Sequence, residues 1–358
     1  MVMIGEGKAT YQGETLDGAE ALKRAGLKPV VLSSKEGLIL LSGTTSVTAF
    51  ASLAIYDAQT LSLTADIAGS ITLEVLKGTL MAMDERLMAV RPHPDQINTA
   101  ANIRAILKDS PMLERYRGHR VQDALSIRCM PQLHGPVKKA IKDAQTTLAI
   151  ELNSSVDNPL IFDEEDGGAV ALMGCNADGT YAGMASDSLC IAITDLCKMS
   201  NSRIDRLLNS LVSELPAFLN KNADFNNGLM MIQYASAGLQ GELRILAHPA
   251  VVDNLTTCAN QEDYVNMGYN AVKKAYDSMH LAKYILAAEL ICDGQALDCY
   301  EDKRCAKGTQ AIYDLLRSKV PEMDNDMPLT PYLEAVAQQI IDRAYIRTVE
   351  ASVGALKF

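Results

Sequence analysis

The chain has 358 residues and a formal net charge of −11, which argues against nucleic acid or an anionic membrane as a partner. It is 48% hydrophobic but only 5% aromatic, and the abundance of Ala, Leu and Met favours helix over sheet. The eight Cys and five His show no zinc-binding spacing, so we expect reduced thiols, no metal site and a cytoplasmic location. We see no signal peptide, and no apolar run approaches the roughly 18 residues of a membrane span.

The first 44 residues predict a small mixed segment with a hairpin. Residues 8–12 and 14–16 flank Gly13 in the manner of two short strands. Asp17 is then placed to cap a short helix.

Residues 45–358 predict a single long-helix bundle, so the expected fold class is mainly all-α. Small or apolar residues recur at helical spacing in segments 45–76, 98–108, 136–152, 188–212 and 270–293. Thr330 and Pro331 predict the start of a last helix whose apolar stripe runs to Ala344. Because several stripes are long enough to pack against a second copy, we expect a homo-oligomer with a helical core.

Residues 121–135, VQDALSIRCMPQLHG, isolate Arg128 among apolar and small residues. An unpaired buried guanidinium is costly, so Arg128 must be paired or solvated, and its planar fork suits a carboxylate. Pro131 and Pro136 predict an ordered connection between helices. Two interpretations stay open here: a ligand-binding arginine, or a structural one paired to Asp123 or another acid.

Four further stretches are unusually polar for segments between apolar helices. They are NSSVDNPLIF at 153–162, GCNADG at 174–179, FNNGLMM at 225–231 (with Glu242 following) and ANQEDYVNMG at 259–268. Any one of them alone predicts a turn or a cap. Five such stretches in one helical protein favour loops that converge on a pocket.

In this order, the stretches resemble the aromatic amino-acid ammonia-lyase family, which includes histidine and phenylalanine ammonia-lyases and related aminomutases. The matching motifs run along the whole chain, as GEG at 5–7, KEGL at 35–38, GT at 43–44, SIRCMPQ at 126–132, DNPLIF at 157–162, NNGLM at 226–230 and ANQED at 259–263. The resemblance implies the long-helix fold of that family and a homotetramer.

Members of this family eliminate ammonia from an α-amino acid and leave an α,β-unsaturated acid. They use a methylidene-imidazolone electrophile that forms from an internal Ala-Ser-Gly. The resemblance implies two catalytic residues here. Arg128 would hold the substrate carboxylate, and Glu242 would stand beside the substrate amine or ring, as in histidine-type members.

The same resemblance assigns five residues to substrate binding. Gln122 and Asn158 would line the electrophile pocket, and Asn176 matches the Asn of the family's G-N-F-H-G loop. Gln261 and Glu262 would lie in a loop that packs near the site. For each, a cap or a buried hydrogen bond is the structural alternative.

The chain also departs from the family pattern. No Ala-Ser-Gly occurs in the 358 residues, and a catalytic tyrosine that lies N-terminal to the matched region in the family has no counterpart. Leu125 stands where the family has a second tyrosine, and Ala177 and Asp178 replace the Phe-His of the G-N-F-H-G loop. The chain thus lacks the cofactor-forming segment, so we expect any methylidene-imidazolone to come from an N-terminal partner chain.

Three hypotheses remain. The first is the C-terminal subunit of a split lyase that acts on histidine or another aromatic amino acid and is inactive alone; Arg128 and Glu242 favour it. The second is a non-catalytic homologue that binds an amino acid or regulates a true lyase, which Leu125, Ala177 and Asp178 favour. The third is a gene fragment.

Overall fold

The computed structural model describes residues 1–222 and 225–358. They form two compact units. Unit 1 comprises residues 1–45 and 155–178, and unit 2 comprises residues 46–154 and 179–358. Sequence analysis assigned residues 155–178 to the bundle, whereas the structure groups them with the N-terminal segment.

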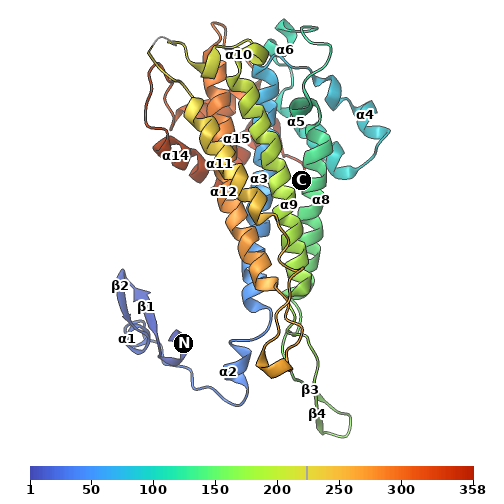
Figure 1. The fold of residues 1–358 in the computed structure, drawn as a ribbon, viewed down its shortest axis with the longest axis vertical. Helices are drawn as coiled ribbons and strands as arrows, with labels where there is room; N and C mark the ends of the chain where they lie inside the picture. Colours follow the sequence, from blue (N-terminus) through green and yellow to red (C-terminus); the bar gives the residue numbers. More distant parts are fainter. Residues whose placement is uncertain (223–224) are drawn as a thin grey trace. The chain divides into compact units, whose positions relative to one another are not determined.

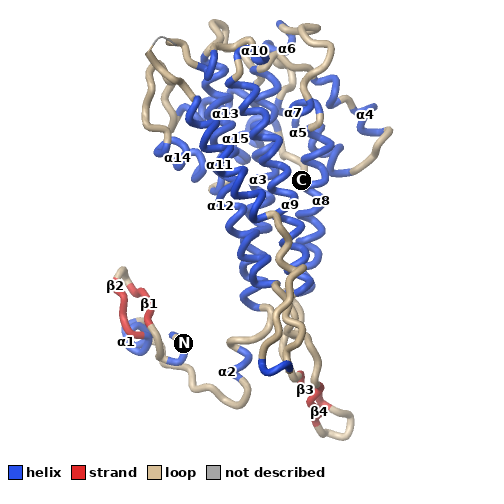
Figure 2. Tube along the Cα trace, in the orientation of Figure 1, coloured by secondary structure: helices blue, strands red, loops and turns tan. Residues whose placement is uncertain are grey.

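Unit 1 contains two antiparallel hairpins, whose strands are drawn in red in Figure 2. The first pairs β1 (Lys8–Tyr11) with β2 (Glu14–Asp17) around Gly13, which has φ +83°, and it confirms the predicted hairpin. The second pairs β3 (Leu160–Asp163) with β4 (Ala169–Leu172). Sequence analysis missed it, because the polar turn signal at 157–159 outweighed the short apolar run that follows.

Unit 1 also contains two short helices, α1 (Gly18–Arg24) and α2 (Glu36–Ile39). The residue before α2, Lys35, is left-handed with φ +71°. Its ammonium forms an ion pair with Asp157, so the segment around α2 is tied to the segment that leads into β3.

The core of unit 2 is a bundle of four long helices, which run side by side in Figure 1. They are α3 (Thr45–Val75), α8 (Met130–Glu151), α9 (Thr180–Leu208) and α12 (Gly268–Asp298). α9 packs against α8, α12 and the shorter α11 (Met230–Leu246). α3 is buried without interruption from Thr60 to Val75. The predicted mainly helical fold class is confirmed.

Shorter elements cover the bundle. Their bounds are η1 Val2–Ile4 in unit 1, and in unit 2 η2 Leu80–Met83, α4 Glu85–Ala89, α5 Pro94–Ile106, α6 Pro111–Arg115, α7 Leu125–Arg128, α10 Ser210–Ser213, η3 Ala217–Leu219, η4 Cys258–Asn260, α13 Lys307–Arg317, α14 Thr330–Ile341 and α15 Ala344–Val353. The expected single last helix is two helices, because left-handed Arg343 (φ +58°) separates α14 from α15. None of the described helices is both long and apolar enough to cross a membrane.

Sequence analysis expected Pro131 and Pro136 to mark a connection between helices, but both lie inside α8. α8 begins at Met130 and continues through Pro136, so this part of the motif is helix rather than a connection. Pro131 lies in the first turn, where its missing N–H needs no partner. Pro136 removes one hydrogen bond. Close packing holds this turn in place, since a Cβ on Gly135 would lie 2.8 Å from the backbone nitrogen of Gln96.

A buried cluster of charged side chains joins α3 to α8. Asp66 on α3 accepts a hydrogen bond from His134 (Nδ1–Oδ1, 2.8 Å) and from Lys138 (Nζ–Oδ2, 2.5 Å), and all three side chains are fully buried. Asn102 donates to the same carboxylate at 2.8 Å. Burial raises the pKa of Asp66, but Lys138 and His134 outweigh this effect and leave the pKa below its usual value.

This cluster predicts acid sensitivity of the fold. Burial lowers the pKa of His134 below its ordinary 6.5. As the pH falls through 6.5, the imidazole is therefore protonated in the unfolded chain while it is still neutral in the folded chain. The stability from His134 is therefore complete above about pH 6.5 and falls by up to about 1.4 kcal/mol per pH unit below it. We expect His134→Gln to flatten the pH dependence of urea unfolding between about pH 7.5 and about pH 5.5.

The exposed His93 offers the matched control. His93→Gln should keep the wild-type slope of unfolding free energy against pH. An unaltered slope in His134→Gln would show that the acid sensitivity arises elsewhere.

Candidate functional site

Arg128 ends the short helix α7, directly before α8. Its Nε is buried, and the side chain forms no hydrogen bond or ion pair with any residue in the described ranges. Asp123, the acid that the structural interpretation proposed as its partner, instead accepts a hydrogen bond from the backbone N–H of Thr79 at 2.8 Å. A half-buried guanidinium without a protein partner must be satisfied by solvent or by a ligand.

The charges around Arg128 favour an anion. Burial raises the pKa of Asp123, against the opposing effects of the Thr79 N–H and of the guanidinium groups of Arg120, Arg206 and Arg128. Arg120 is paired to Glu214 at 3.1 Å. Arg206 on α9 has no ion pair within the described part of the chain, and burial followed by the nearby Arg120 lowers its pKa. Two unpaired guanidinium groups therefore stand near one buried carboxyl group.

Arg206 was not identified from the sequence. It lies in the amphipathic segment 188–212, where an arginine is the ordinary polar residue of a solvated helix face. Only the packing of α9 against the loop that carries Asp123 brings it into this neighbourhood.

Gln132, one helical turn after Arg128, adds a second unsatisfied group, since its Oε1 is buried without a hydrogen-bond partner. It lines a cavity of about 510 Å³ between α8 and α9, together with Cys129, Asp195 and Met199. Buried polar atoms in native proteins nearly always have a partner, so two such atoms one turn apart are compatible with a ligand site.

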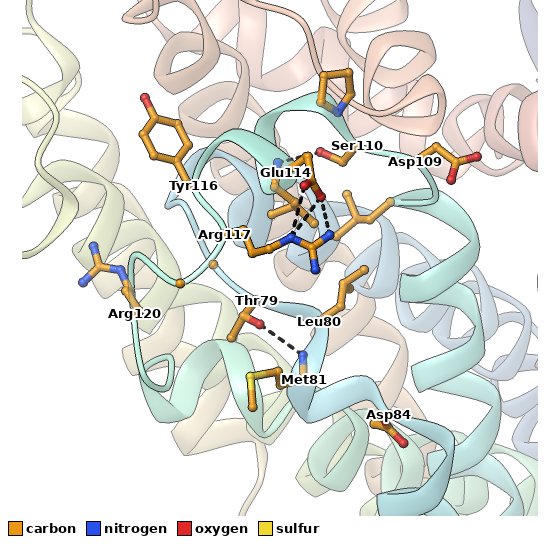
Figure 3. A pocket seen from close by; sticks show the side chains of 15 residues that line it. Thr79, Leu80, Met81, Asp84, Asp109, Ser110, Glu114, Tyr116, Arg117 and Arg120 are labelled. Carbon is orange, nitrogen blue, oxygen red and sulfur yellow. Dashed lines mark hydrogen bonds and ion pairs between the residues drawn. The ribbon is translucent and has the colours of Figure 1, made fainter.

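A larger cavity of about 860 Å³ lies next to this segment (Figure 3). Thr79, whose backbone N–H binds Asp123, forms part of its wall. Both of its arginines are already paired. Glu114 holds Arg117 through contacts of 3.1 and 3.2 Å to its Nε, and Glu214 holds Arg120. Arg128, by contrast, has no partner within the described residues and is free to bind a carboxylate.

Two other expected residues of unit 2, Gln122 and Glu242, are exposed. Gln122 is exposed in the loop before α7. Glu242 is exposed on α11, opposite the middle of α9, where Gln240 donates to the carbonyl of Thr194 at 3.2 Å. The cavity between α9 and α11 is lined by Gln240 but not by Glu242.

Gln261 and Glu262 lie in the loop before α12, and both are exposed. The loop is tightly wound. Cys258, Ala259 and Asn260 all have left-handed φ values, of 47°, 51° and 69°. Glu262 closes the turn, because its carboxylate accepts a hydrogen bond of 2.5 Å from Thr257 and its backbone pairs with the same residue.

The length of α12 separates this loop from Arg128. The carbonyl of Ser126, beside Arg128, contacts Arg203, which is paired to Glu289 on α12. Twenty-one residues separate Glu289 from Gly268, where α12 begins, and this is about 31 Å of helix. Arg128 and Glu262 of one chain therefore cannot contact one small substrate together.

Asn158 and Asn176 belong to unit 1, where the structure brings their segments together. The Asn158 side chain accepts a hydrogen bond from the backbone N–H of Gly174 at 2.9 Å, and the Asn176 amide donates to the carbonyl of Ser155 at 3.4 Å. Both side chains remain exposed. These two asparagines thus belong to one polar surface of unit 1.

Comparison with known proteins places this chain in a family. Residues 1–318 match the family model described as aromatic amino acid lyase, and the chain belongs to that family of carbon–nitrogen lyases. The resemblance expected from the motifs is therefore confirmed.

Individual relatives show the same relationship. The chain is 41% identical over 353 residues to a histidine ammonia-lyase of Alkaliphilus oremlandii, covering 99% of this chain and 69% of that protein. The histidine ammonia-lyase of Trypanosoma cruzi matches with a TM-score of 0.90 at 33% identity, over 98% of this chain and 67% of that one. A phenylalanine aminomutase of Pantoea agglomerans matches with a TM-score of 0.88 at 34% identity, over 95% and 69%.

Because Arg128 has no protein partner within the described residues, we expect its substitution to have little effect on the stability of the fold. We expect Arg128→Met to change the free energy of unfolding by less than about 1 kcal/mol, because no buried acid loses its partner. Arg203→Met is the matched control. It leaves the fully buried Glu289 unpaired and should cost about 3–5 kcal/mol. Urea unfolding followed by circular dichroism measures both, and equal losses would restore the structural interpretation of Arg128.

Proposed function

We propose that this chain forms the carboxylate-binding part of an ammonia-lyase that acts on histidine or a related aromatic amino acid. The single observation that carries this is the unpaired, half-buried guanidinium of Arg128 at the end of α7. Histidine is the first choice of substrate because the relatives at about 41% identity are named histidine ammonia-lyases.

The residues of this chain can bind and orient such a substrate. The planar fork of Arg128 would hold the α-carboxylate with two parallel hydrogen bonds, and its burial would strengthen that contact. Arg206 would add positive charge near the same group. Fixing the carboxylate fixes the amine and the β-carbon relative to the protein, which lowers the entropic part of the barrier. Glu242 is our proposed residue beside the substrate amine or ring, contributed by whichever copy of the chain brings it there.

The residues proposed for the electrophile pocket are compatible with a methylidene-imidazolone. Gln122 and Asn158 both present exposed amides, and Gln122 makes no hydrogen bond within the described residues, so its donor and acceptor are available. When present, that group supplies the electrophile that turns the amine into a leaving group. The 358 residues contain no Ala-Ser-Gly, so we propose that residues outside this sequence supply it, in a separate N-terminal subunit or in a longer form of the chain.

We further propose a homo-oligomer, with the family's tetramer as the expected form. The long helices carry large apolar side chains in contact with water, including Tyr181 (74% exposed) and Met184 (59% exposed) on α9, and Tyr56 on α3. Exposed apolar surface of this extent is typical of protein–protein contacts. The separation of about 31 Å along α12 supports the same proposal, because a second copy could bring Glu262 to an Arg128 that its own chain cannot reach. A cytoplasmic location fits the eight free cysteines.

A non-catalytic homologue that binds an amino acid is the second candidate. Leu125 favours it, since the side chain in the place of the family tyrosine is an exposed leucine, 62% accessible, that can neither donate nor accept a proton. Ala177 and Asp178 point the same way, because they replace two aromatic residues of the family motif.

The decisive assay follows the ultraviolet absorbance of the unsaturated product. We expect residues 1–358 alone to show no turnover of histidine, because positioning without the electrophile cannot lower the barrier enough. Addition of a polypeptide that carries the Ala-Ser-Gly segment should restore it, and Leu125→Tyr should raise the restored rate. Turnover by residues 1–358 alone would refute the need for a further segment. Histidine binding without turnover in the complete assembly would favour the non-catalytic homologue.

The carboxylate role of Arg128 has its own measurement. In calorimetric titration with histidine, Arg128→Met should lose roughly 1.5–3 kcal/mol of binding free energy, the value of a charged hydrogen bond. Arg128→Lys should lose less, because an ammonium keeps the charge but not the two-pronged contact. Unchanged affinity in Arg128→Met would exclude the role.

Light scattering tests the oligomer. At micromolar concentration we expect a mass several times that of the 38.7 kDa chain. A charged residue in the exposed stripe, such as Met184→Lys, should shift the mass downward without loss of helix. A monomeric wild-type chain would contradict the proposal.

A further inference from the structure

We propose that Arg203 is a positioning residue for Arg128: it holds the backbone of α7 through the carbonyl of Ser126 and so sets where the Arg128 fork points. The inference deepens the proposed function, because it rests on Arg128 as the carboxylate-binding group. Arg203 lies on α9, whereas Ser126 and Arg128 lie on α7. Its guanidinium binds two partners, Glu289 through two nitrogens and Ser126 through the third.

Two of those nitrogens bind Glu289 on α12. Nε contacts Oε1, Nη2 lies 3.0 Å from Oε2, and both side chains are fully buried. Other donors hold Glu289 in turn, since the hydroxyl of Thr72 lies 3.0 Å from Oε1 and that of Ser200 contacts Oε2. The guanidinium plane of Arg203 is therefore fixed by groups from three helices.

The third nitrogen, Nη1, donates to the carbonyl of Ser126 at 3.4 Å. Ser126 lies within the last turn of α7, where backbone carbonyls have no partner inside the helix. A helix of four residues has little stability of its own, so external contacts must decide its position. Arg203 supplies such a contact two residues before Arg128.

A second contact holds the other side of Arg128. Met130 is fully buried and packs against Gly69 of α3, where a Cβ would lie 2.3 Å from the methionine sulfur. The same Cβ would lie 3.4 Å from Cζ of Arg203. The missing side chain at Gly69 thus lets both Met130 and Arg203 reach their places, and Arg128 is held between Ser126 and Met130.

Stability alone does not account for this arrangement. A fully buried ion pair adds little net stability compared with a well-packed apolar pair of similar volume. Burial and the neighbouring Glu289 raise the pKa of Asp293, one turn further along α12, well above its usual range, which disfavours a second charge there. What the ion pair offers beyond packing is a rigid third donor aimed at the segment that carries the binding residue.

The test separates position from folding with a paired substitution. Arg203→Met combined with Glu289→Met removes both buried charges, leaves no unpaired ion, and deletes the donor to Ser126. Arg203→Lys is the companion variant, which keeps the charge but not the three-pronged geometry. Hydrogen exchange by mass spectrometry then reports on the amides of residues 127–129, which are hydrogen-bonded within α7 to Ala124 and Leu125.

We expect exchange at residues 127–129 to accelerate roughly two- to tenfold in both variants, the effect of one lost hydrogen bond, while α9 and α12 keep their protection. Unchanged exchange at these residues would overturn the proposal. Equal acceleration throughout the bundle would also overturn it, because Arg203 would then serve the fold alone.

A binding measurement on the complete assembly links position to recognition. Histidine and histamine differ only in the carboxylate, so the variants should weaken histidine several-fold and leave histamine unchanged. Equal weakening of both ligands would refute the positioning role. A wild-type assembly with no preference for histidine over histamine would refute the carboxylate role of Arg128 instead, and the exchange result would still decide whether Arg203 positions α7.

Discussion

The bundle depends on the rule that a carboxyl group buried on α3 must find polar partners on neighbouring segments of the chain. Asp66 binds His134 and Lys138 on α8. Glu74, eight residues later, contacts the hydroxyl of Ser110 and accepts the backbone N–H of Ala306 at 2.7 Å. Because an unpaired ion in this interior would be costly, these contacts allow few alternative registers of the surrounding helices. Burial also raises the pKa of the Glu74 carboxyl group, because a charged carboxylate is poorly solvated in this interior.

Arg128, on α7, is a half-buried charge that has no such partner within the described residues, and this is why it defines the site. Several of its neighbours have protein partners: one oxygen of Asp123 binds Thr79, Arg203 binds Glu289, and Arg120 binds Glu214. A network that fixes these neighbours while the Arg128 guanidinium stays unpaired within the described residues is suited to bind an anion, since little reorganisation is needed when the ligand arrives. The same pairing of buried polar groups therefore makes the core rigid and leaves the Arg128 guanidinium available to a ligand.

Much of this could be predicted from the sequence. Small and apolar residues at helical spacing predicted α3, α9 and α12, Gly13 between alternating residues predicted the first hairpin, and the ordered motifs identified the lyase family. Arg128 was found because it stands alone among apolar residues. These features are local, since helix periodicity, turn chemistry and motif composition each depend on neighbours within a few residues along the chain.

Other features were decided only by tertiary structure. Pro136 lies inside α8 because packing at Gly135 compensates for one lost hydrogen bond, and no local rule contains that packing. The acid beside Arg128 could have been its partner by sequence, but the fold gives Asp123 to the backbone of Thr79. Arg206 lies near Asp123 only because α9 packs beside the loop that carries Asp123. Sequence determined which residues could bind a carboxylate, and three-dimensional packing decided which of them stayed free, because pairing depends on distances between segments far apart in the chain.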